Sequence, residues 1–123
     1  MMTLMSLMLA LVVGTASWGP WRVAEVVPNF GPGLWGEGTA CGHVLTRSLR
    51  GVAHRSLPCG TRIELRWHGH QVVTRVVDRG PYPTNYDYRE MPLDLTRRTF
   101  RELLGRPLDG RGVLRDVRWR VRR

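Results

Sequence analysis

One aspartate in the sequence stands where acid–base chemistry is expected. Asp78 follows two valines and precedes an Arg-Gly-Pro turn that ends a strand abruptly. This position anchors its backbone in a core and leaves the carboxyl at the rim. Such a carboxyl acts as a general acid when its surroundings raise its pKa. Asp78 is therefore the candidate proton donor. The alternative is turn chemistry, in which the carboxylate accepts backbone N–H bonds.

Three further residues are candidates for the same site. His54 either supports the acid, by hydrogen bonding to Asp78 or to substrate, or is simply a polar residue satisfied by packing. Arg79 is adjacent to Asp78, and its charge would lower the pKa of that carboxyl if the two side chains pack together. Asp94 precedes an expected helix, where it either joins the site or interacts with the helix N-terminus.

Aromatic and imidazole side chains are candidates for ligand contact. Four aromatic residues fall in expected loops: Trp35, Tyr82, Tyr86 and Tyr88. They either stack on sugar faces or cover the edge of the core. His68 and His70 flank a glycine and are expected to be exposed in a turn. The sequence has no Cys or His spacing of the zinc type, so no metal site is expected.

The two cysteines predict one disulfide. Cys41 and Cys59 each precede a glycine in turn-like sequence, whereas free buried thiols are expected within apolar runs. In an exported domain the expected state is a bridge that stabilises the fold by about 3 kcal/mol. The alternative is two independent buried thiols.

The charge balance is strongly basic. The formal net charge is +9, from nineteen arginines and no lysine against ten acids. A nucleic-acid-binding chain is expected to use some lysine beside arginine, so the composition does not favour that function. The charge favours an anionic partner, including peripheral association with an anionic envelope.

The N-terminal segment resembles an export signal. Residues 1–21 carry no charge, and residues 4–13 are almost wholly apolar. That run is too short to cross a bilayer as a helix, which takes about 20 residues. With Gly14-Thr15-Ala16 as a small-residue cleavage site, residues 1–16 are expected to be a signal peptide and residues 17–123 the mature domain. The alternative is a buried or membrane-interfacial segment. No cysteine lies near residue 16, so a lipid anchor is not expected.

Short strands dominate the rest of the chain. Alternation predicts strands over 23–27, 61–67, 72–77 and 117–121, with the middle two forming a hairpin. The glycine-rich stretch 30–42 is expected to be a loop. One helix is expected, with Thr96 as its N-cap, Phe100 and Leu103 on its apolar face, and Gly105 at its end. This pattern predicts a mainly β fold, a small barrel with one short α-helix.

Three ordered motifs resemble the rare lipoprotein A (RlpA)-like domain. They are GVAHRSLPCGTR at 51–62, VVDRGPY at 76–82 and LDLT at 93–96. The segment FGPGLWG at 30–36, followed by Thr39-Ala40, resembles the first loop of that family. The resemblance covers about residues 24–121 and implies a six-stranded double-psi β-barrel, a fold shared with barwin and expansins.

The resemblance also implies a function. Characterised RlpA enzymes are peptidoglycan lytic transglycosylases that leave 1,6-anhydro-muramic ends. Transfer of their motifs makes Asp78 the catalytic acid and His54 the essential histidine. Asp94 takes the position that expansins keep near the sugar, and Arg79, Trp35 and Tyr82 are supporting or substrate-binding candidates. The expectation is therefore an exported, monomeric lyase of the cell envelope that acts on peptidoglycan glycan strands without a cofactor. The alternative is a non-catalytic carbohydrate-binding or wall-loosening module of expansin or barwin type.

Overall fold

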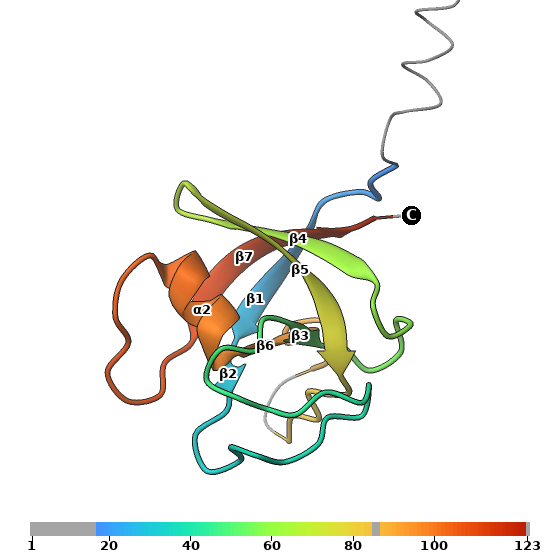
Figure 1. The fold of residues 1–123 in the computed structure, drawn as a ribbon. Helices are drawn as coiled ribbons and strands as arrows, with labels where there is room; N and C mark the ends of the chain where they lie inside the picture. Colours follow the sequence, from blue (N-terminus) through green and yellow to red (C-terminus); the bar gives the residue numbers. More distant parts are fainter. Residues whose placement is uncertain (1–16, 85–86, 123) are drawn as a thin grey trace, which may run out of the picture.

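Seven strands and one helix form in the part of the chain that the computed structural model describes, residues 17–84 and 87–122 (Figure 1). In chain order they are β1 (Arg22–Val27), β2 (Asn29–Phe30), β3 (Val52–Ala53), β4 (Arg62–Trp67), β5 (His70–Asp78), β6 (Asp94–Thr96), α2 (Arg97–Leu104) and β7 (Leu114–Val121). The strands form one curled sheet in the order β1-β7-β4-β5-β3-β6-β2. The mainly β class is confirmed. The signal peptide expected at 1–16 lies outside the described residues.

The strand count is seven rather than the expected six, because a proline divides the first strand. Pro28 has no backbone N–H and lies between β1 and β2. The two pieces also take different partners. β1 runs antiparallel to β7, whereas β2 runs parallel to β6. A single stretch of chain therefore contributes to both ends of the sheet.

The β4–β5 hairpin forms where the alternation predicts it. Ile63 and Leu65 are fully buried on one face of β4. The turn between the strands has His68 at φ 46° and Gly69 at φ 81°. Two successive positive φ values are typical of the tight turns that match the twist of a hairpin.

Glu64 departs from this alternation. It lies on the opposite face of β4 from Ile63 and Leu65 but is only 2% exposed. Arg120 donates to its Oε1 at 2.7 Å, and Arg66 and Gln71 donate to its Oε2 at 3.0 and 2.8 Å. The Trp21 ring lies 4.4 Å from the Arg120 guanidinium. A layer of arginine and tryptophan thus covers the outer face of the sheet and buries the carboxylate.

The helix α2 begins and ends as expected. The Thr96 side chain accepts a hydrogen bond from the Thr99 backbone N–H, and Gly105 at φ 77° ends the helix. Phe100 and Leu103 are buried against the sheet. At eight residues, this helix is too short to cross a membrane, and no other described segment offers a longer one.

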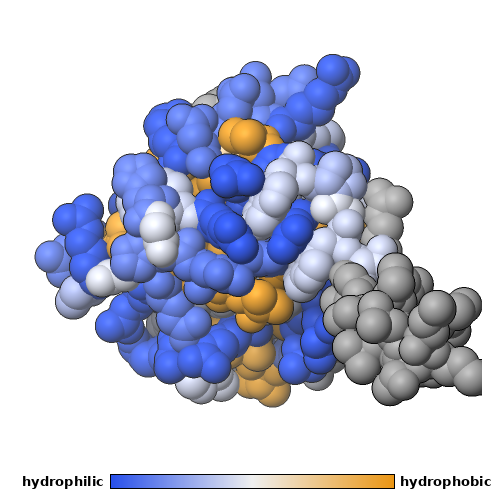
Figure 2. Space-filling model, turned by 90° about the horizontal axis from the view of Figure 1, so that it is seen from above, coloured by the Kyte–Doolittle hydropathy of each residue, from blue (hydrophilic) through white to orange (hydrophobic). Residues whose placement is uncertain are grey.

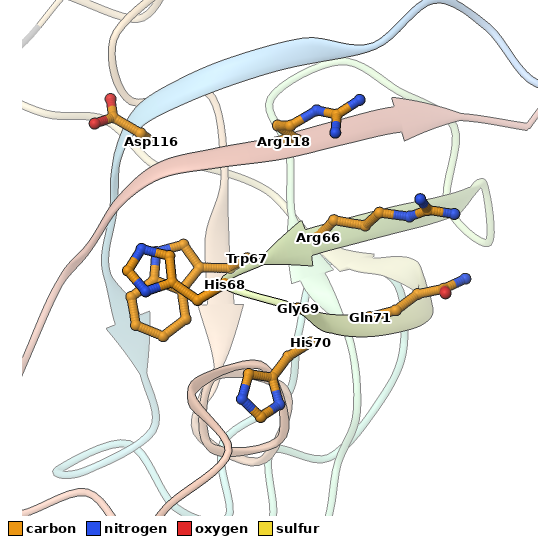
Figure 3. Close-up of a pocket in the computed structure, with 8 residues that line it drawn as sticks. All are labelled: Arg66, Trp67, His68, Gly69, His70, Gln71, Asp116 and Arg118. Carbon is orange, nitrogen blue, oxygen red and sulfur yellow. The ribbon is translucent and has the colours of Figure 1, made fainter.

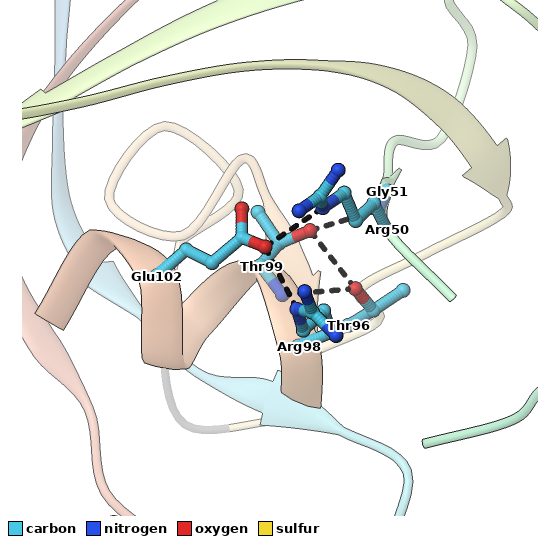
Figure 4. A network of polar contacts seen from close by, with 6 residues as sticks. All are labelled: Arg50, Gly51, Thr96, Arg98, Thr99 and Glu102. Atoms are coloured by element: carbon cyan, nitrogen blue, oxygen red, sulfur yellow. Dashed lines mark hydrogen bonds and ion pairs between the residues drawn. The ribbon is translucent and has the colours of Figure 1, made fainter. Parts of the chain in front are cut away.

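Polar contacts attach α2 to the start of β3 (Figure 4). The Gly51 N–H donates to Thr99 Oγ1 at 2.8 Å, and the Thr96 N–H donates to the Gly51 carbonyl at 3.0 Å. A Cβ at Gly51 would collide with the side chain of Val77. Glycine therefore allows β3 to approach β5 closely while the helix cap fixes it from the other side. Nearby, Glu102 accepts from both Arg50 and Arg98.

The apolar residues inside the curl form one core. Its fully buried members come from six of the strands, from the helix and from the residue before β6: Ala24, Val27, Val52, Ile63, Leu65, Val76, Leu93, Leu95, Leu103 and Val117, among others. Seen from above, the surface is mostly hydrophilic, with hydrophobic residues in small separate patches (Figure 2). This core packs against β3, β5 and β6, the strands that carry the candidate site.

Candidate active site

Asp78 and Asp94 lie in one row across three strands. Strand β3 runs between β5 and β6, parallel to the first and antiparallel to the second. Ala53 of β3 pairs with Asp78 on one side and with Asp94 on the other. Two strand spacings separate the aspartate backbones, about 10 Å, and residues paired in a row share one face of a sheet. The fold therefore brings together two carboxyls that are distant in the sequence.

An irregular register sets this row. Val52 pairs with Val76, but the next residue, Ala53, pairs with Asp78 instead of Val77. Such a bulge redirects the side chains that follow it. Val77 is fully buried, and Asp78 becomes the residue opposite Ala53. The two valines before Asp78 are thus used for the core, as the sequence indicated.

Asp94 has the properties of a proton donor. Burial and the nearby charge of Asp78 raise the pKa of the Asp94 carboxyl from 3.8 to about 7, while the Leu95 N–H and the Arg111 charge act in the opposite direction. Its Oδ1 is buried and has no hydrogen-bond partner among the described residues. Asp94 is not the N-cap of α2, because Thr96 takes that position. The carboxyl is thus neither a cap nor part of an ion pair.

A cleft of about 340 Å³ opens beside Asp94. Its other walls are β2, the loop that follows it as far as Leu34, and the side chain of Arg111. Arg111 also approaches the Pro32 carbonyl at 3.5 Å. Neither Asn29 nor Arg111 was a sequence candidate, because one follows a strand-breaking proline and the other is one of nineteen arginines. The cleft gives Asp94 access to a ligand from outside.

Asp78 is held as a hydrogen-bond acceptor at the end of β5. Its Oδ1 accepts from the Ala40 N–H at 2.9 Å and from its neighbour Arg79 N–H at 2.8 Å. Both donors are backbone groups, which suit a charged carboxylate. The turn chemistry that the sequence left open as an alternative for Asp78 is therefore present. The same contacts fix the orientation of the carboxyl in the row with Asp94.

His54 lies beside this row but does not bond to Asp78 through its side chain. The contact between them is from the His54 backbone N–H to the Asp78 carbonyl, at 3.2 Å. Burial, followed by the charges of Arg55, Arg79 and Arg22, lowers the pKa of His54 from 6.5 to about 4. The ring is therefore neutral near pH 7.

The tautomer of His54 is set by the backbone. Its Nδ1 accepts from the Ser56 N–H at 3.1 Å and from the Leu57 N–H at 3.0 Å. An imidazole nitrogen that accepts carries no proton, so the proton of the neutral ring is on Nε2. His54 consequently presents a fixed N–H donor rather than a base.

Arg79 organises the loop that follows β3. Its Nη1 donates to the Leu57 carbonyl at 2.7 Å and to the His54 carbonyl at 3.2 Å, and its Nη2 lies 3.5 Å from Cys59 Sγ. The guanidinium thus binds carbonyl groups of that loop rather than the Asp78 carboxylate. Its contacts are those of a positioning residue.

The expected disulfide is confirmed. Cys41 and Cys59 are bonded, with a Cα–Cα distance of 5.6 Å and a sequence separation of 18. Cys41 directly follows Ala40, whose N–H donates to Asp78. The bridge therefore fixes the segment that orients one carboxyl of the row to the loop that Arg79 organises.

The candidate aromatic residues have different surroundings. The Trp35 ring packs on Gly31, where a Cβ would collide with it, and Arg47 lies 5.1 Å from its centroid. Tyr82 is 64% exposed, and Tyr88 stacks under Arg55 at 3.5 Å. Tyr86 lies outside the described residues. Tyr82 is the aromatic ring most available to a ligand, and Trp35 closes the first loop.

A second cleft lies at the β4–β5 hairpin and lacks the acid pair (Figure 3). The His68 ring stacks on Trp67 with centroids 3.9 Å apart, and His70 points away from it. Both histidines are exposed, as expected. The carboxylate that lines this cleft, Asp116, is part of β7, and its side chain points away from the two histidines in Figure 3. The paired carboxyls are those of Asp78 and Asp94, in the row through Ala53.

The sequence is similar to a known family and to named relatives. Residues 29–116 match the family described as "Lytic transglycolase". The "Probable endolytic peptidoglycan transglycosylase RlpA" of Synechocystis sp. is 38% identical over 71 residues, 56% of this chain and 19% of that protein. A protein of the same name from Treponema pallidum is 42% identical over 52 residues, 41% of this chain and 16% of that protein. The chain thus spans less than a fifth of either relative.

One solved structure has a similar fold. "Streptomyces papain inhibitor (SPI)" matches with a TM-score of 0.61 and 23% identity, over 89% of this chain and 100% of that chain. At this identity the likeness concerns the arrangement of the strands alone.

Proposed function

Because the chain belongs to the RlpA-like double-psi β-barrels, the family described as lytic transglycolase, we propose that it cleaves glycan strands of peptidoglycan between MurNAc and GlcNAc. The observation that carries this proposal is a partly buried carboxyl, Asp94, with a pKa raised to about 7 beside a second carboxylate, Asp78. Glycosidic cleavage needs an acid that is still protonated near neutral pH.

In the proposed reaction, Asp94 rather than Asp78 donates the proton. The sequence motif favours Asp78 for this role. Both hydrogen bonds to its Oδ1, however, come from backbone N–H groups, which suit a charged carboxylate better than a proton donor. Asp94 protonates the oxygen of the leaving sugar, and the bond from that oxygen to C1 of the muramic residue breaks. The carboxylate of Asp78 stabilises the positive charge that develops at C1.

The second half of the proposed reaction needs no water. The C6 hydroxyl of the same muramic residue attacks C1 and gives its proton to the Asp94 carboxylate. The products are a 1,6-anhydro-muramic end and a free GlcNAc hydroxyl, and the acid is returned in its starting form. One carboxyl therefore acts first as acid and then as base. His54 supports this site as a neutral Nε2–H donor toward substrate.

We further propose that the domain, residues 17–123, works outside the cytoplasm after an N-terminal signal. The Cys41–Cys59 disulfide supports this compartment, since such bonds persist where the surroundings are oxidising. N-terminal sequencing of protein from the envelope fraction is expected to find an end near Ser17. Intact cytoplasmic protein with Met1 at its end would contradict this proposal.

The function is tested by digestion of purified peptidoglycan, with and without stem peptides, and mass spectrometry of the products. Anhydro-muramic ends are expected from the wild-type protein and not from Asp94→Asn, with circular dichroism to show that the variant is folded. Reducing ends would instead indicate a hydrolase in which Asp78 and Asp94 act as a pair. Retention on insoluble wall without any product would indicate a non-catalytic carbohydrate-binding module.

A further inference from the structure

A third cleft, next to the acid row, is lined by hydrogen-bond donors. It has a volume of about 410 Å³ and contains Arg22, Arg55, Arg89, His54, Tyr88 and Trp119, among others. His54 directly follows Ala53, the residue between the two aspartates. One residue of the cleft is therefore the chain neighbour of the row at which the glycosidic bond is proposed to break.

The arginines of this cleft have no acidic partners. None of Arg22, Arg55 and Arg89 forms an ion pair with a described residue. Among the described residues that line the cleft, none carries a carboxylate. Three positive charges thus line one cleft without an ion-pair partner. Elsewhere Glu64 and Glu102 each form ion pairs with two arginines.

Two of the guanidinium groups are held in place by aromatic rings. Arg55 lies 3.5 Å from the centroid of Tyr88, and Arg22 lies 5.4 Å from that of Trp119. Stacking uses the flat face of a guanidinium and leaves the N–H groups at its edge free. The N–H groups at that edge can donate two parallel hydrogen bonds to a carboxylate.

The histidine in the cleft adds a donor of fixed direction. Because two backbone N–H groups occupy Nδ1, the free Nε2 of His54 carries the proton. The neutral ring also adds no fourth positive charge. A ligand that fits this set of side chains has several acceptor oxygens and a negative charge.

We propose that the cleft of Arg22, Arg55 and Arg89 binds a carboxylate carried by the glycan strand and so selects acidic over neutral glycans. This inference rests on the proposed function and names the substrate class of the same site. An uncharged polysaccharide would leave three converging charges without partners. A muramic residue carries a lactyl carboxylate, or stem-peptide carboxylates, close to the bond that is cut.

The test measures binding rather than turnover. The protein is the Asp94→Asn variant, so the ligand stays intact. The ligands are a muramic-acid oligosaccharide with free lactyl carboxylates and the same compound with each carboxyl reduced to an alcohol. We expect calorimetry to show at least about 10-fold tighter binding of the acidic compound at low salt, with the difference shrinking as salt screens the charges. A third ligand that carries stem peptides identifies which carboxylate is bound.

A matched pair of substitutions locates the effect. Arg55→Gln in this background is expected to reduce the preference, since Arg22 and Arg89 remain, and to leave binding of the carboxyl-reduced compound unchanged. Arg75→Gln removes the same charge from an exposed position of β5 outside the cleft and is expected to keep the preference.

Equal binding of the two compounds, a preference that Arg55→Gln leaves undiminished, or binding of neither would each overturn the inference. The inference and the proposed function fail separately. Carboxylate preference without cleavage by the wild-type protein overturns the function alone, and cleavage without preference overturns the inference alone.

Discussion

Glu64 and Asp94 are two carboxyls of the same sheet with little exposure, and their surroundings shift their pKa values in opposite directions. Burial alone raises the pKa of Glu64, but hydrogen bonds from Arg120 and Arg66 outweigh it, so the pKa is lowered. Asp94 is also desolvated, yet its strongest charged neighbour is another acid, Asp78, and its pKa rises to about 7.

The contrast shows what keeps a carboxyl with little exposure protonated near neutral pH. Burial is common to both residues, and the partner decides the outcome. Around Glu64 the sheet supplies two guanidinium groups and an amide, which fix a charged carboxylate in a structural role. Around Asp94 it supplies a carboxylate and a cleft. Five substitutions or titrations test this difference.

The largest expected effect is on the acid itself. Asp94→Asn keeps the shape of the side chain but removes the proton, and it is expected to reduce glycan cleavage by at least about 100-fold. Glu64→Gln is the matched change at the other carboxyl and should leave the rate per folded molecule close to wild type. The release of anhydro-muramic ends measures both. An equal loss of cleavage rate in the two variants would show that Asp94 has no special role in the reaction.

Asp78→Asn tests the neighbour of the acid. Without this charge the transition state loses stabilisation, and a loss of about 2 kcal/mol corresponds to about 30-fold in rate. The pKa of Asp94 should also fall, because the charge of Asp78 is one of the causes that raise it. Activity measured against pH should therefore decline from a lower pH than in wild type. A variant that cuts at the wild-type rate would remove Asp78 from the reaction.

Arg120→Gln should give Glu64 part of the character of Asp94. It removes two hydrogen bonds from a carboxylate that is 2% exposed. Hydrogen bonds to charged groups contribute about 1.5–3 kcal/mol, so a loss of about 2 kcal/mol in the free energy of unfolding is expected. Urea denaturation measures it. Arg122→Gln, an exposed arginine beyond the same strand, serves as the control and should change stability little.

The two carboxyls should also contribute oppositely to the pH dependence of stability. The pKa of Asp94 is raised on folding, so its contribution is complete below about 3.8 and is lost as the pH rises through about 7. The pKa of Glu64 is lowered, so its contribution is present above 4.5 and is lost in acid. Asp94→Asn should therefore be more stable than wild type at pH 8 in thermal unfolding. If Asp94→Asn is less stable at pH 8, the raised pKa is wrong.

The smallest effect is expected from a positive charge placed near Asp94. Leu34 lines the same cleft and is 41% exposed. Leu34→Arg should lower the pKa of Asp94 by about 1 unit or less and move the alkaline decline of activity toward lower pH. Leu34→Gln adds polarity without charge and should leave that decline in place. Identical pH profiles for the two variants would contradict the electrostatic account.

Local patterns predicted the parts of the fold that depend on local physics. Alternation gave the hairpin of β4 and β5, and the Thr96 cap and Gly105 gave the ends of α2. The turn-flanked cysteines gave the disulfide. The motifs singled out Asp78, Asp94 and His54 as candidates. Each of these predictions rests on residues that are neighbours in the sequence or on the family resemblance.

The roles of these residues depend on partners that no local pattern identifies. Alternation places Glu64 on a polar face, and only the arrival of Arg120 from β7 buries it. Likewise, the pKa of Asp94 is raised partly by Asp78, which an irregular register between β3 and β5 brings into its row. Arg111 reaches the same cleft from the loop before β7. Long-range packing, rather than residue type, thus gives the two aspartates their different surroundings.

The row through Ala53 also affects how the protein folds. β3 pairs in parallel with β5, which lies beyond the β4 hairpin strand, and antiparallel with β6, which follows a further loop. Contacts between such distant segments carry a loop-closure cost and form slowly compared with a hairpin. The β4–β5 hairpin can therefore form early. The two carboxyls come together only when β3 has paired with both β5 and β6. A nascent or partly folded chain has no acid pair, so the proposed cleavage can begin only once folding is complete.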